Sequence, residues 1–326
     1  MRLRYKTRPL RCCLSVALWI IAISGCKQSN LRVAVIPRTT ALTLWEAAHA
    51  GAEFAAGPRS VQVYWNAPTS EDDIKQQAAL VDRVIDKRYK GLIIAPDQPL
   101  ALMAPIRRAL NKEVPTVVIA SPLPIPPQRN LAYIVNDDDA SGYLAATRIG
   151  QILNGRGSVA VLGVNPESLS ELDILHAFEN TLQKRFPDVV IAERRIGTHN
   201  GSEAQQITDE VLAAHHELDA IFTLSAVASY GAIAALQSRG LTGQVKLIGF
   251  EQSVELGSQV RSHAMDSLIA EDTYQMGYLA MTMLAAHRNG TLPAQMIKLQ
   301  PTLLTWENID SPQAQRLMNR DWGHRP

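Results

Sequence analysis

From residue 31 onward, short apolar runs rich in β-branched residues alternate with longer stretches of helical periodicity. The short runs predict strands because a strand buried on both faces reads as a continuous apolar segment. They lie at residues 32–36, 61–65, 91–95, 116–120 and 131–135, and then at 158–162, 189–195, 220–224, 246–249 and 267–270. The longer stretches predict helices at residues 44–56, 73–87, 100–110, 141–153, 172–185, 203–214 and 228–239.

This alternation is typical of βαβ units, in which a helix connects two parallel strands and covers one face of the sheet. Because the strands fall into two successive series, the pattern predicts an α/β protein with two doubly wound parallel-sheet lobes. About 300 residues are enough for two cores of ordinary size.

The N-terminal segment has the three regions of an export signal. Five basic side chains precede an apolar stretch at residues 14–23, and the small residues Ser24 and Gly25 stand directly before Cys26. A signal peptidase needs small side chains there, and the apolar stretch is too short for a bilayer span of about 20 residues. The segment resembles a bacterial lipobox. It predicts a signal peptide at 1–25, lipidation of Cys26, and a lipid-anchored protein on the periplasmic side of the cell envelope, at the inner or the outer membrane.

Removal of residues 1–25 changes the charge and the cysteine content. The remaining chain has 32 − 5 = 27 Lys and Arg against 31 Asp and Glu, a formal charge of −4. This acidic balance argues against nucleic-acid binding, which needs clustered positive charge. Cys12 and Cys13 leave with the signal peptide and Cys26 is used by the lipid, so no thiol is left for a disulfide, a metal site or a nucleophile.

The sequence gives little support for catalysis, for a metal or for a cofactor. The Gly-Arg-Gly at residues 155–157 precedes a strand, whereas a phosphate-binding loop follows one. The adjacent His215 and His216 point in different directions on a helix and have no third ligand at useful spacing. Asp137, Asp138 and Asp139 are interpreted as the N-terminal cap of a helix, where carboxylates are favourable.

Several segments in order resemble the type I periplasmic solute-binding proteins of ABC transporters, the sugar-binding group related to ribose-binding protein. The segment 31–36 (LRVAVI) with Thr39, Thr40 and Trp45 resembles the first strand, ligand loop and helix of that family. Further similar segments are 89–96 (YKGLIIAP), 133–137 (YIVND), 219–222 (DAIF), 247–251 (LIGFE) and 303–309 (LLTWENI).

The resemblance implies two lobes joined by a three-crossing hinge, with the ligand in the cleft between them. It places lobe one at residues 31–134 and 272–300 and lobe two at 135–271 and 301–326. It also implies a non-enzymatic protein that captures a sugar or polyol and delivers it to an ABC permease. We expect a monomer without a cofactor.

Matching the family's pocket positions onto this chain gives eight candidate ligand contacts. Trp45 falls where the family stacks an aromatic ring on the sugar, and Glu251 falls where an acidic residue accepts sugar hydroxyls. We expect these two residues to face one another across the cleft. The other candidates are Thr39, Thr40, Ser121, His199, Ser225 and Glu271.

Two departures from the family concern arginine. Ala120 and Ser121 stand where family members often carry Asp-Arg, and Ile174 stands where they carry Arg. The two pocket glutamates therefore have no evident cationic partner. Either the ligand supplies many hydrogen-bond donors, as a polyol or an amine-bearing sugar would, or one glutamate is protonated.

Three alternatives remain open. A ligand-sensing lipoprotein would present its closed form to a membrane sensor kinase or chemoreceptor. A repressor of the LacI type has the same fold but requires an N-terminal helix-turn-helix in place of an export signal. A lipid-anchored hydrolase on a doubly wound sheet would need a nucleophile with a paired base.

Overall fold

The computed structural model describes residue 1 and residues 31–71, 73–287 and 291–318. The predicted signal peptide and the lipidation site Cys26 lie outside the described residues. All helices and strands that the structure describes fall between Leu31 and Met318.

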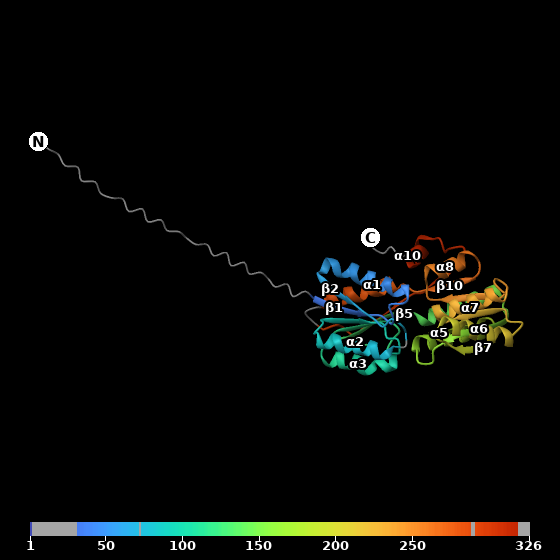
Figure 1. The fold of residues 1–326 in the computed structure, drawn as a ribbon, viewed down its shortest axis with the longest axis horizontal. Coiled ribbons are helices and arrows are strands. Elements are labelled where there is room, and N and C mark those ends of the chain that lie inside the picture. The colour runs from blue at the N-terminus through green and yellow to red at the C-terminus, as the bar shows by residue number, and fades with distance from the viewer. Residues whose placement is uncertain (2–30, 72, 288–290, 319–326) are drawn as a thin grey trace.

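The described strands form two six-stranded sheets, each of which has helices on both faces (Figure 1). The sheet of lobe one has the order β11-β5-β4-β3-β1-β2, and the sheet of lobe two has the order β12-β10-β9-β8-β6-β7. The first contains β1 (Leu31–Ile36), β2 (Val61–Trp65), β3 (Gly91–Ile94), β4 (Thr116–Ala120), β5 (Leu131–Asn136) and β11 (Met296–Leu299). The second contains β6 (Arg156–Val164), β7 (Asp188–Ile196), β8 (Ala220–Thr223), β9 (Lys246–Phe250), β10 (Ser267–Ala270) and β12 (Thr302–Thr305).

The fold confirms the prediction of two doubly wound lobes, with one difference in strand direction. All described pairs are parallel except β12, which runs antiparallel to β10. The ten strands predicted from periodicity are all present. β12 overlaps the segment 303–309, which resembles the closing strand of the family, whereas β11 was not predicted. The chain passes between the sheets after β5, after β10 and between β11 and β12.

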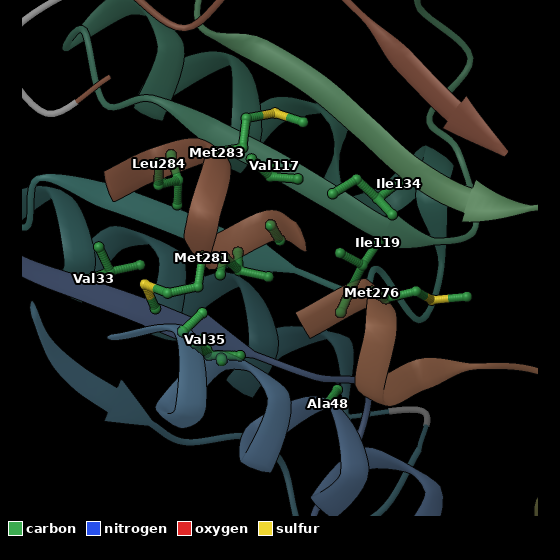
Figure 2. Packing of buried hydrophobic residues seen from close by; sticks show 14 of the residues in the cluster. Val33, Val35, Ala48, Val117, Ile119, Ile134, Met276, Met281, Met283 and Leu284 are labelled. Carbon is green, nitrogen blue, oxygen red and sulfur yellow. The ribbon is translucent and has the colours of Figure 1, made fainter. Parts of the chain in front are cut away.

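In lobe one, α1 (Thr43–Ala56) and α9 (Thr273–Ala286) cover one face of the sheet, while α2 (Ile74–Asp86) and α3 (Pro99–Asn111) cover the other. Figure 2 shows the first of these cores, in which Met276, Met281 and Leu284 of α9 pack over the strands. A short 3₁₀ turn, η1 (Gly57–Arg59), ends α1.

In lobe two, α4 (Asp138–Ile152) and α5 (Leu169–Arg185) cover one face of the sheet. The opposite face is covered by α6 (Gly201–Ala214), α7 (Ala226–Ser238), α8 (Val254–Arg261) and α10 (Pro312–Met318). The Asp137 carboxylate accepts a hydrogen bond from the backbone N–H of Ala140, which confirms the predicted cap of α4. Among the described helices none is both long and apolar enough to cross a membrane.

Candidate functional site

A cavity of about 220 Å³ lies where loops from the two lobes meet. In lobe one its lining follows the carboxyl ends of β1, β2 and β3, and in lobe two those of β6, β7, β8 and β9. In each sheet the strand order reverses here, at β1 in lobe one and at β6 in lobe two. Loops diverge at such a switch point, so doubly wound sheets bind ligands there. Typical pockets for drug-sized molecules measure about 300–1,000 Å³, so this cavity suits a smaller ligand.

Arg38 follows β1 and forms the basic part of the cavity wall. Its Nη1 lies 3.7 Å from Glu251 Oε1 of the other lobe, and its Nη2 donates a hydrogen bond of 2.7 Å to Ser121 Oγ. Its guanidinium carbon lies 5.6 Å from the ring centroid of Trp45, within the range of a cation–π contact. Burial lowers the pKa of Arg38, but the carboxylates around it, Glu251 first among them, raise it by more. Arg38 is therefore a permanent charge of the site.

Glu251 follows β9 and faces Arg38 from lobe two. Its Oε2 accepts a hydrogen bond of 2.9 Å from the backbone N–H of Ala226, at the start of α7. Its φ of 61° lies in the left-handed region. A residue with a Cβ is strained in this conformation, and the contacts around it must offset the cost in free energy. Burial raises the pKa of the Glu251 carboxyl, and Arg38 opposes that shift.

Glu171 on α5 provides a second carboxyl group of lobe two. Its Oε2 accepts a hydrogen bond of 2.9 Å from the backbone N–H of Asn165. Burial raises its pKa to about 8; Arg38 opposes the shift and Glu251 adds to it. At neutral pH this carboxyl group therefore holds a proton in the ligand-free protein.

The rim of the cavity carries a second contact between the lobes. Nδ1 of His199, which follows β7, lies 3.3 Å from Oε2 of Glu71, which follows β2. The side chain of His199 is 38% exposed and that of Glu71 only 14%, so the histidine is the solvent-facing partner.

The structure places the eight candidate contacts in two groups. His199, Ser225 and Glu251 line the cavity. The other five, all in the described part of the chain, do not line it: Thr39, Thr40, Trp45, Ser121 and Glu271.

Two members of the second group support Arg38 from behind. Trp45 is 1% exposed in the core between α1 and the sheet, and Ser121 accepts the hydrogen bond of the guanidinium. Arg38 thus contacts both Trp45 and Glu251, two residues that we expected to face one another directly. Ligand contact by Trp45 and Ser121 stays a prediction.

Thr39, Thr40 and Glu271 make contacts within the protein. The Thr39 Oγ1 accepts a hydrogen bond of 3.0 Å from the backbone N–H of Ala41, and the Thr40 N–H donates one of 2.9 Å to Pro68. Glu271 lies at the second crossing between the lobes and is 5% exposed. Burial, together with the nearby Glu251 charge, raises its pKa to about 8.

The expectation that the pocket glutamates have no cationic partner was wrong for Glu251. Arg38 faces it, although the two residues are 213 positions apart in the chain. Sequence reasoning also missed Glu71, Asp97 and Glu171, which line the same cavity. The available signal was position alone, because Arg38, Glu71 and Asp97 all lie shortly after strands of one sheet.

Comparison with known proteins agrees with this architecture. The sequence profile of the family described as "Periplasmic binding protein domain" matches residues 33–292, most of the chain. The chain belongs to the periplasmic binding protein family. It is a binding protein of the type I fold and not an enzyme.

Relatives of this binding protein are distant in sequence. The D-allose-binding periplasmic protein of Escherichia coli K12 is 21% identical over 79% of this chain and 85% of its own length. The xylitol-binding protein of Mycolicibacterium smegmatis is 23% identical over 62% of this chain and 56% of its own.

A solved structure gives the same fold. The ABC transporter solute-binding protein of Agrobacterium vitis, bound to α-D-tagatopyranose, superposes with a TM-score of 0.83 at 22% identity. The match covers 89% of this chain and 99% of that one.

Proposed function

We propose that this periplasmic binding protein captures a small polar ligand, a sugar or polyol, in the cavity between its lobes and delivers it to an ABC permease. The observation that carries the proposal is the cavity itself, which lies at both switch points and is lined by charged and polar side chains of both lobes. Two distant relatives are named as binding proteins for D-allose and for xylitol, which supports a sugar or polyol as the ligand.

The proposed mechanism is a hinge. The three crossings of the chain between the sheets allow the lobes to move as units, with lobe one at residues 31–136 and 272–300 and lobe two at 137–271 and 301–326. The first boundary lies two residues later than the resemblance implied, because β5 continues to Asn136 in the sheet of lobe one. A ligand that contacts both walls binds the closed form better than the open form, and it therefore shifts the equilibrium toward closure. The permease then reads the closed shape of a monomer.

A thermal-shift screen against sugars and polyols tests the ligand class. The protein would be produced without residues 1–25 and with Cys26→Ser, which removes none of the described elements. A ligand at a hundredfold excess over its Kd stabilises the folded state by about 2.7 kcal/mol. If no sugar or polyol raises the melting temperature, the proposed ligand class is wrong.

We further propose that Cys26 carries a lipid that tethers the protein at the periplasmic side of the envelope. The support is the order of basic residues, apolar stretch and small residues before this cysteine. Cells fed labelled palmitate should label the wild-type protein, whereas Cys26→Ser should remain an unlabelled precursor. Cys13→Ser is the matched control and should label like the wild type. Equal labelling of Cys26→Ser and the wild type would exclude the anchor.

A further inference from the structure

The described lining of the cavity carries more acidic than basic side chains. Among the described residues of its lining, Arg38 is the single Arg or Lys. The acidic residues of the same lining are Glu71, Asp97, Glu167, Glu171 and Glu251. A neutral sugar would leave this imbalance as it is.

Arg38 does not saturate even the carboxyl group that it faces, that of Glu251. Its Nη2 is engaged with Ser121, and its Nη1 lies 3.7 Å from Glu251, which is longer than a hydrogen bond. In addition, the Arg38 Nε is buried without a hydrogen-bond partner among the described residues. The Arg38–Glu251 pair is therefore unsaturated across the cavity, and a hydroxyl group could accept from Nη1 and donate to Glu251.

The carboxyl group of Glu171 is a second group in the cavity wall that a ligand could contact. Its carboxyl group is largely buried in the cavity wall, and its hydrogen bond comes from a backbone N–H and not from a basic side chain. A buried carboxylate without a paired cation either takes up a proton or waits for a cation from elsewhere. A ligand that brings a positive charge would meet this need, with Glu71 of the opposite wall contributing to the same negative field.

We propose that the ligand is a small polyhydroxylated molecule that carries a protonated amine, such as an amino sugar or an amino polyol. Its hydroxyl groups lie between Arg38 and Glu251, and its ammonium group lies beside Glu171. This inference rests on the proposed function and narrows its ligand class.

Such a ligand would release a proton when it binds. The Glu171 carboxyl has a pKa of about 8 in the ligand-free protein, set by burial, by Arg38, and by the charges of Glu251 and Glu71. An ammonium group beside it stabilises the carboxylate and lowers that pKa, so the proton leaves at pH 7. The affinity for the amine therefore rises from pH 6 to pH 8, and a neutral sugar shows no such proton release.

Titration calorimetry with matched pairs of compounds tests the proposal. The pairs are D-glucosamine with D-glucose, D-mannosamine with D-mannose, and D-glucamine with D-glucitol, and N-acetyl-D-glucosamine removes the charge while it keeps the other hydroxyls. In at least one pair, the amine member should bind about 10- to 100-fold tighter, the effect of a charge-assisted hydrogen bond in a buried site. Its binding heat at pH 7 should depend on the ionisation enthalpy of the buffer.

Two variants locate the effect. Glu171→Gln keeps the shape of the side chain and should remove most of the preference for the amine together with the buffer-dependent heat. Glu53→Gln makes the same change at an exposed site on α1 and should change neither. The buffer dependence of the wild type stands as a test even if Glu171→Gln folds poorly.

The outcomes separate the two proposals. Binding of the neutral member as tightly as the amine, or an amine preference without proton release, overturns the inference and leaves a sugar-binding function in place. If no amine and no neutral member of any pair binds, and the sugar and polyol screen is also negative, both the inference and the proposed function are wrong.

Discussion

The two lobes have the same layered architecture but present different chemistry to the cavity. Lobe one contributes the permanent cation, Arg38, which Ser121 and the ring of Trp45 hold in place. Lobe two contributes Glu251 and Glu171. Glu251 accepts a hydrogen bond from the backbone N–H of Ala226, and Glu171 accepts one from the backbone N–H of Asn165. The sheets and helices thus fix where the walls lie, while a few residues at the ends of strands and at the start of α5 decide the chemistry of each wall.

The architecture common to the lobes predicts the largest effect. A Cβ built at Gly277 would overlap the carbonyl oxygen of Ala48 between α9 and α1, and one at Gly142 would overlap that of Ile174 between α4 and α5. Each helix pair would have to separate, so Gly277→Ala and Gly142→Ala should each lower the free energy of unfolding by about 3 kcal/mol.

Chemical denaturation would measure both losses. Gly57→Ala is the control, because a Cβ there meets nothing within 4 Å and φ is −50°, which alanine adopts readily. This variant should be neutral or more stable by up to about 1 kcal/mol. If only one of the two variants lost stability, the helix pairs of the two lobes would differ in how tightly they pack, despite their common architecture.

The charge difference between the lobes predicts the next effect. Arg38→Met keeps most of the side-chain volume but leaves Glu251 buried without its cation, which should cost about 1–3 kcal/mol of stability at pH 8. The loss should be smaller at pH 5, because Glu251 can then hold a proton. Arg107→Met, an exposed change on α3, is the control. Equal losses at both pH values would mean that the packing of the side chain matters and its charge does not.

The buried glutamate at the second crossing predicts a pH dependence of unfolding. Burial raises the pKa of Glu271 to about 8 from 4.5. Between these values the folded state keeps a proton that the unfolded state has lost, so stability falls as the pH rises through this window. A full proton is worth at most about 1.4 kcal/mol per pH unit.

Glu271→Gln cannot titrate, so its stability should fall less between pH 6 and pH 7 than that of the wild type, by about 1 kcal/mol. Thermal unfolding at the two pH values measures the difference, with Glu53→Gln as the exposed control. An unchanged slope in Glu271→Gln would show that the wild-type pH dependence comes from other groups. Glu171, whose pKa burial raises to about 8, is the first to test, followed by Asp138, whose pKa burial raises to about 7.

The rim contact predicts the smallest effect. The pair of His199 and Glu71 joins the lobes, but the histidine is partly exposed, and such pairs contribute about 0–1 kcal/mol. His199→Gln should shift the equilibrium between the closed and open forms about fivefold or less, as read by energy transfer between labels on the two lobes. His216→Gln, on an exposed residue of the same lobe, should leave it unchanged. A larger shift would make the rim contact, and not the cavity, the main determinant of closure.

The sequence determined the two-lobe fold to a large extent because strand and helix patterns are local. The bounds predicted for β2, β4 and β10 agree with the structure. β11 has half-exposed positions and carries no such run, so periodicity could not reveal it. Glu251 was found because it directly follows the buried strand β9 in a segment that resembles the family.

Only the tertiary structure decided the composition of the site. The sequence does not distinguish a tryptophan near the start of a helix that faces the cleft from one that faces the core. In the structure, Trp45 lies in the core of lobe one, next to Arg38. Arg38 and Glu251 come from different sheets, and the packing of one lobe against the other brings them together. The local sequence determines which residues follow each strand. Burial and the contact between loops of the two lobes determine the charge of these side chains and which partners they have.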